Sequence, residues 1–107
     1  MKFVNLCPHA VTFVNESGDV IRIVEPSGTV ARLTTATETI GEVDSIPITH
    51  TVFGPITGLL EPSEGVIYIV SSLVASQCQD RDDVFIPNDS VRNSEGVIIG
   101  CKSLGRI

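Results

Sequence analysis

The sequence predicts a mainly β fold, a small antiparallel sandwich or partly open barrel with one short helix. Valine and isoleucine dominate a hydrophobic fraction of 42%, and β-branched residues fit a pleated, half-buried surface better than a helix. Short apolar segments alternate with clusters of Gly, Pro, Asn and Asp at the spacing typical of all-β domains. The 107 residues are enough for one modest core, so we expect residues 1–107 to form a single β-rich domain.

The first quarter of the chain predicts a hairpin. Residues 3–6 form a first short strand that Pro8 interrupts, and the strand resumes over residues 10–14. The cluster Asn-Glu-Ser-Gly-Asp at 15–19 is a turn signal, and apolar residues of 20–24 return as the second strand.

The middle of the chain predicts two long strands joined by a turn. Residues 25–28 carry a proline and a glycine at spacing suited to a β-turn. The β-branched stretch 29–40 is followed by the turn cluster 41–45, and residues 46–53 run back. Pro47 has no N–H for a ladder, so the returning strand is expected at an edge.

The last part of the chain predicts a buried strand, the helix and a C-terminal hairpin. Residues 54–65 are a Gly/Pro-rich connection of a length that is often functional. Residues 66–70 form the most continuous apolar run, which predicts a central strand. A serine pair then precedes a helical segment near residues 72–79, and short strands at 84–86 and 97–101 complete the hairpin.

The charge of the chain excludes several classes of partner. A net charge of −6 with 7 basic side chains disfavours wrapping around DNA or RNA and binding to an anionic membrane surface. A compact anion held by one or two arginines stays compatible with this charge. The apolar runs are too short to span a bilayer, and the N-terminal segment lacks a signal-peptide pattern. We therefore expect a cytoplasmic protein.

The sequence lacks the residue sets of familiar catalytic and metal sites. The cysteines Cys7, Cys78 and Cys101 are odd in number and show no C-x-x-C spacing, so buried reduced thiols are expected. A Cys7–His9 pair is disfavoured because their segment is extended. Residues 80–83 could bring carboxylates to a metal, but an acidic turn that ends the helix is the simpler interpretation. We expect no enzyme activity, no metal and no cofactor.

Anion binding is the chemistry that the side chains favour. Arg32 lies in an otherwise neutral β-branched strand, and Arg92 lies before the last turn. A guanidinium binds phosphate through two parallel hydrogen bonds. Ser71 and Ser72 precede the helix and offer hydroxyl and N–H donors. A structural salt bridge is the alternative role for Arg32, and ion pairs with flanking acids are expected for Arg81.

Several segments carry a resemblance to a known family. The chain reads NLxPHAVT from Asn5, PSGTVAR from Pro26, YIVSxLVA from Tyr68, RxDV from Arg81, and VRxxxGxIIGC from Val91. In these features it resembles a family of small proteins encoded by bacteriophages and prophages, over nearly its whole length. Members of that family often carry Tyr, Pro and Thr where this chain has Phe53, Leu60 and Cys7.

The resemblance implies a phage origin, and small phage accessory proteins commonly act by binding. Some inhibit host proteins, and others sequester nucleotide signals of host immunity such as those of the CBASS and Thoeris systems. We therefore expect a non-enzymatic binding protein of the host cytoplasm that captures a small anionic ligand, a cyclic nucleotide, and forms a homo-oligomer, with a dimer as the first expectation. The expected ligand-binding residues are Asn5, His9, Arg32, Phe53, Ser71, Ser72 and Arg92.

Two alternatives stay open at this stage. The first is a protein–protein interaction module, either a phage structural accessory or an inhibitor of a host enzyme. The second is a nucleotide-cleaving enzyme with His9 as general base. Arginines that converge on a pocket are required by the nucleotide-binding hypotheses and not by the interaction module.

Overall fold

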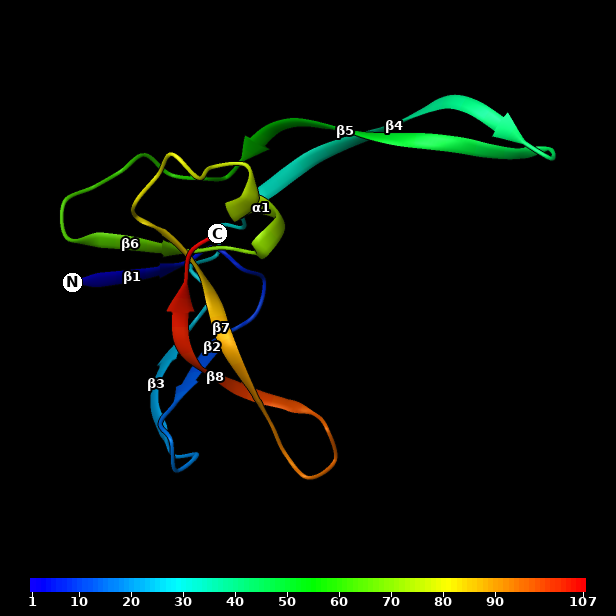
Figure 1. The fold of residues 1–107 in the computed structure, drawn as a ribbon. Helices are drawn as coiled ribbons and strands as arrows, with labels where there is room; N and C mark the ends of the chain where they lie inside the picture. Colours follow the sequence, from blue (N-terminus) through cyan, green and yellow to red (C-terminus); the bar gives the residue numbers. More distant parts are fainter.

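The computed structural model describes residues 1–107 and contains eight strands and one helix (Figure 1). The predicted mainly β fold with one short helix is confirmed. The elements in chain order are β1 (Lys2–Asn5), β2 (Val11–Val14), β3 (Val20–Val24), β4 (Arg32–Val43), β5 (Ile46–Thr57), β6 (Val66–Ile69), α1 (Ser72–Ser76), β7 (Val84–Arg92) and β8 (Ile98–Gly105).

Six strands form one open sheet in the order β1-β6-β7-β8-β2-β3, and β4 pairs only with β5. The pairing is mixed rather than antiparallel throughout, because β1–β6, β6–β7 and β2–β8 are parallel. The bend around Pro8 separates β1 from β2, so β1 pairs with β6 instead of joining the predicted N-terminal hairpin. The two ends of the sheet meet at a single bridge between Asn5 and Pro26, without closing into a barrel.

The core lies on both sides of β6, which confirms the predicted central strand. Alternate residues of a strand point to opposite faces, so Tyr68 and Ile69 enter different clusters. The first cluster packs β6 against α1 and the second packs it against β2, β3 and β8. The buried members are Leu6, Ala31, Tyr68, Val70, Val74, Ala75, Cys78 and Val84 in the first, and Cys7, Val11, Phe13, Val24, Ile69 and Cys101 in the second.

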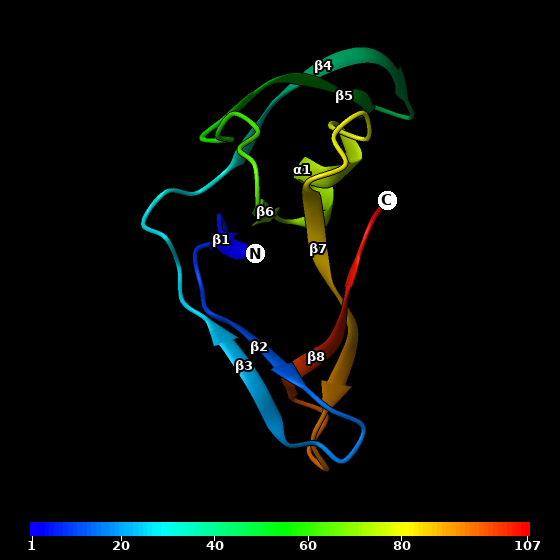
Figure 2. The same cartoon turned by 90° about the vertical axis from the view of Figure 1, so that its left-hand side faces the viewer.

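Strands β4 and β5 form a hairpin that projects from the body of the molecule, and we call it the arm (Figures 1 and 2). Each strand has 12 residues, a length of about 40 Å at the usual rise per residue. The two-residue turn at its tip consists of Asp44 and Ser45, both with positive φ as in a type I′ turn. At its root, a Cβ at Gly58 would overlap the Val30 carbonyl oxygen, so the two ends of the arm cross where only glycine fits.

Helix α1 is a single short turn over Ser72–Ser76, within the longer helix predicted near residues 72–79. Ser71 is its N-cap, and the hydroxyl of Ser71 accepts a hydrogen bond of 3.4 Å from the Val74 N–H. No helix of the structure is both long enough and apolar enough to cross a membrane.

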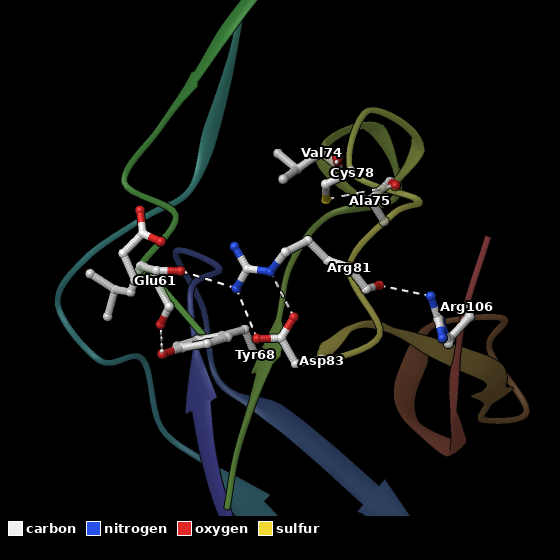
Figure 3. Close-up of polar contacts among 9 residues, drawn as sticks. Glu61, Tyr68, Val74, Ala75, Cys78, Arg81, Asp83 and Arg106 are labelled. Carbon is white, nitrogen blue, oxygen red and sulfur yellow. Dashed lines mark hydrogen bonds and ion pairs between the residues drawn. The ribbon is translucent and has the colours of Figure 1, made fainter. Parts of the chain in front are cut away.

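A polar cluster around Arg81 fastens the loops above β6 (Figure 3). Arg81 donates two hydrogen bonds of 2.8 Å to the Asp83 carboxylate and one of 3.1 Å to the Leu60 carbonyl. Tyr68 donates its hydroxyl to the Glu61 carbonyl at 2.9 Å, and Arg106 donates to the Arg81 carbonyl at 2.7 Å. The ion pair expected for Arg81 is therefore present, and its contacts join the loop after β5, the segment after α1 and the C-terminus.

Candidate ligand-binding site

A hollow of about 250 Å³ lies at the root of the arm, where β4 leaves the body beside α1. It brings together Arg32, the first residue of β4, and Ser71, the N-cap of α1, although the two are far apart in the sequence. The remaining walls are mostly apolar. The lining residues are Pro8, Val30, Ala31, Arg32, Leu33, Ser71, Leu73 and Val74.

Arg32 differs from the other arginines in having no partner within the chain. The guanidinium groups of Arg81, Arg92 and Arg106 all donate to oxygens of the protein, and that of Arg22 lies 4.1 Å from the centre of the Phe3 ring. Arg32 belongs to neither ion pair. Its five N–H donors are therefore free to bind an anion in the hollow.

Ser71 adds a hydroxyl, part of whose capacity is used in capping α1. Because α1 has only five residues, the helix contributes little dipole beyond its own N–H groups. Ser72 is the first helical residue, is exposed, and does not line the hollow. Ser71 and Arg32 are thus the polar side chains that the structure brings together.

A second, larger hollow of about 400 Å³ lies between β2, β7 and β8. His9 lies at its rim, is exposed, and has Nδ1 3.2 Å from the Ala10 carbonyl. Few polar side chains converge on this hollow, and no arginine lines it. The lining residues are His9, Ala10, Val11, Thr12, Pro87, Ser90, Ile98, Ile99, Gly100 and Cys101.

Asn5 lies outside both hollows and has a structural role. The residue is 1% exposed. Its amide nitrogen donates to the carbonyls of His9 and Val24, at 2.8 and 3.0 Å, and its Oδ1 accepts from the Cys7 N–H at 2.9 Å. These three bonds fix the bend between β1 and β2 and leave no face of the side chain for a ligand.

Phe53 and Arg92 also lie away from Arg32. Phe53 is in β5, further out along the arm, opposite Thr35. Arg92 ends β7 and donates to the Gly96 carbonyl of its own hairpin at 2.8 Å. Neither residue lines either of these two hollows, so the residues expected to share one site are distributed over several regions of the molecule.

The cysteines are buried and unpaired by disulfides. Burial raises the pKa of the Cys7, Cys78 and Cys101 thiols, which keeps them protonated at neutral pH. No group of three His, Cys, Asp or Glu side chains lies close enough together to hold a metal ion. In the acidic segment 80–83, the Asp83 carboxylate is engaged by Arg81.

The apolar walls of the smaller hollow were not expected from the sequence. The sequence pattern makes Pro8 a strand breaker and places Leu73 within the predicted helix near residues 72–79. Leu73 is 48% exposed and lines the hollow together with Ser71. The sequence signal that could have indicated this wall is Leu73 itself, an apolar residue in the first turn of a short helix capped by Ser71.

No family model matches the chain, and neither a curated protein nor a solved structure matches it. Its function is therefore inferred from the geometry of the hollows and of the arm.

Proposed function

We propose that this protein is a phage-encoded, non-enzymatic binding protein that captures a small anionic ligand at the Arg32 hollow. The ligand class that fits is a nucleotide, in particular a cyclic nucleotide signal of host anti-phage immunity, which the protein would sequester. The observation that carries the proposal is the unpartnered guanidinium of Arg32 beside the Ser71 hydroxyl in a concave, otherwise apolar surface.

The two halves of the hollow suit the two halves of a nucleotide. Arg32 can hold a phosphate through two parallel hydrogen bonds, and Ser71 lies where it can donate a further one. Pro8 and Leu73 offer apolar surface to a base or ribose. A volume of about 250 Å³ is slightly below the usual range of ligand pockets, and Arg32 and Ser71 are exposed, so the ligand would be held at an open surface and extend beyond it.

The charge of the chain makes Arg32 decisive for this ligand. A net charge of −6 repels an anion at long range. A bidentate contact with the exposed guanidinium of Arg32 must therefore supply most of the attraction, and added salt screens this contact as well as the long-range repulsion.

The separation of His9 from Arg32 supports binding without catalysis. His9 is the only candidate base that the sequence offered for nucleotide cleavage, and it lines the other hollow. A general base has to reach the proton that it removes. The Ser71 hydroxyl, in turn, accepts from the Val74 N–H rather than facing a base.

The test is capture from a nucleotide library by the purified protein, followed by removal of excess ligand, heat denaturation and mass spectrometry of what is released. Arg32→Ala should weaken binding by about 10-fold to 150-fold, the loss typical of hydrogen bonds to a charged group, and should keep the melting temperature within a few degrees. Arg32→Lys should restore binding only in part, because an ammonium cannot reproduce the fork.

Arg22→Ala is the matched control, because it removes the same charge from a guanidinium that rests on the Phe3 ring. It should leave capture nearly unchanged. If both variants lose affinity for the nucleotide equally, Arg32 contributes only through its charge and not as a direct ligand contact, which would contradict the proposed site. The released nucleotide should be chemically intact; hydrolysed product that disappears in His9→Ala would support the enzyme alternative instead.

A protein–protein interaction module is the second candidate, and the arm favours it. Six large apolar side chains of the arm are exposed, more than a ligand site at its root requires. If the library yields no bound nucleotide while the arm still mediates association, this candidate replaces the first.

A further inference from the structure

The arm carries an apolar face and a threonine face. In an antiparallel pair, directly opposed residues lie on the same face and alternate along the strands. The pairs on the threonine face are Thr35 with Phe53, Thr37 with Thr51, and Thr39 with Thr49. The apolar face contains the pairs Val43–Ile46, Gly41–Ile48 and Ala36–Val52, with Glu38 and His50 opposed between the last two.

No part of the chain covers this apolar face. Ile46 is 67% exposed and Val43 is 55% exposed, and beyond its root the arm stands clear of the body in both views (Figures 1 and 2). An isolated two-stranded hairpin is at best marginally stable in water. A long hairpin with an exposed apolar face is therefore stabilised by a surface that packs against that face.

The dimensions of the chain show how much surface a partner could cover. A compact domain of 107 residues has a radius of gyration of about 13 Å, against 17.0 Å here. A compact monomer of this mass exposes about 5,800 Å², against 6963 Å² here. The excess of about 1,200 Å² exceeds the roughly 800 Å² that each partner contributes to a standard interface.

The same chain also carries a surface that complements the arm. The hollow between β2, β7 and β8 is lined by Ile98 and Ile99, which are about half exposed. The turn at the tip of the arm adds Asp44 beside the apolar side chains of Val43 and Ile46, whereas Glu42, opposite Pro47, lies on the threonine face. Arg92 lies opposite Ile98 in the β7–β8 hairpin and, with one of its nitrogens bonded to Gly96, retains free donors for a carboxylate.

We propose that the arm of one copy packs its apolar face against the β2–β7–β8 hollow of a second copy, with its acidic tip beside that copy's Arg92. Every chain has both an arm and a β2–β7–β8 hollow. Two copies can therefore make the contact reciprocally in a two-fold dimer, which buries both arms and both hollows. This assembly is independent of the proposed ligand: it requires the arm face and not Arg32.

Sedimentation equilibrium of the native chain and of two charge variants tests the arm face. Ile48→Glu and Thr49→Glu are neighbours that add the same charge on opposite faces of the arm. The native chain should be dimeric at micromolar concentration. Ile48→Glu should raise the dissociation constant on the order of 10- to 100-fold, the effect of losing one buried isoleucine, whereas Thr49→Glu should raise it less than about threefold.

A native chain that stays monomeric at about 100 µM would overturn the proposal, and so would equal effects of the two variants. Far-ultraviolet circular dichroism checks that each variant is folded. Should Ile48→Glu fail this check, photo-cross-linking of a chain that is altered only at Ile46 tests the assembly instead.

Cross-linking identifies the surface that receives the arm. A benzophenone amino acid at Ile46, in an equimolar mixture of isotope-labelled and unlabelled protein, should give cross-links between a labelled and an unlabelled chain, mapping to residues 98–101. Cross-links between two arms would overturn the arm-to-hollow geometry. The absence of any cross-link between copies would overturn the assembly altogether. Nucleotide capture by the same sample, with and without Arg32→Ala, reports separately on the proposed function.

Discussion

The body and the arm of this molecule hold their strands together by different means. In the body, β6 is flanked by strands on both sides and by a buried cluster on each face, and the Arg81 cluster fastens the loops above it. In the arm, β4 and β5 have each other and no third layer. The body is thus stabilised by burial within one chain, while the arm depends on its own hydrogen-bond ladder and on what it contacts.

The largest expected difference between the two regions is in the free energy of unfolding when a buried or an exposed isoleucine is replaced by alanine. Ile69 is 0% exposed, so Ile69→Ala should lower the free energy of unfolding by about 2–5 kcal/mol, because it leaves a cavity. Ile48→Ala in the arm should lower it by less than about 0.5 kcal/mol in the monomer. Urea unfolding followed by circular dichroism measures both, and similar values would mean that the arm belongs to the folded core.

The junction between the two regions gives the next largest effect. Gly58 has φ +80° and its Cβ position overlaps the Val30 carbonyl, whereas Gly28 has φ +96° and faces open space. Both alanine variants carry the strain of a positive φ, about 1–2 kcal/mol, and only Gly58→Ala adds a backbone clash of about 1–3 kcal/mol. Gly58→Ala should therefore melt at a clearly lower temperature than Gly28→Ala. Equal melting temperatures would show that the arm root can shift without cost.

The smallest expected effect concerns the Arg81 cluster of the body and depends on pH. The hydrogen bond from Arg81 holds the pKa of Asp83 below its usual value near 4. A depressed folded-state pKa stabilises the protein above the unfolded pKa, and this contribution disappears as the pH falls through the folded value. Asp83→Asn should cost about 1–3 kcal/mol at pH 7.

The difference between native protein and Asp83→Asn should shrink as the pH is lowered below about 4. Chemical unfolding at several pH values measures it. Glu95→Gln, a neutralised carboxylate in an exposed turn, is the control and should show no such trend. A constant difference down to about pH 2 would show that the Asp83→Asn substitution disturbs packing rather than an ion pair.

Much of the fold could be predicted because local residue preferences specify it. The β-branched segments became strands, Ser71 capped the helix, and Pro47 lies in a strand with one neighbour. The pairing of β1 with β6 could not be predicted, because it joins residues more than 60 positions apart. The free-standing arm was missed because alternation in residues 46–52 shows that one face is apolar, and not which chain covers it.

The sequence predicted which residue types could bind the ligand, but it did not predict which of these residues lie close together. Arg32 and Ser71 were both named from their chemistry, but their proximity depends on how β4 leaves the body beside α1. The sequence predicted Asn5 as a ligand contact, but in the structure its side chain makes three hydrogen bonds to backbone groups. Because every residue has the same backbone groups, the sequence does not show which of them a side chain will bind.

The parallel pairs of the sheet set the order in which the chain can fold during its synthesis. β1 pairs with β6, and β2 pairs with β8 at Phe13 and Cys101, so both parallel pairs need segments that are synthesised much later. The arm, by contrast, closes through a two-residue turn and needs no later segment. On a translating ribosome, the β2–β3 hairpin and then the arm can therefore form while β1 still lacks its partner β6 and β2 still lacks β8. Because loop closure over long separations is slow, the edge of β1 is exposed to other nascent chains until β6 emerges, and the free edge of β2 until β8 emerges.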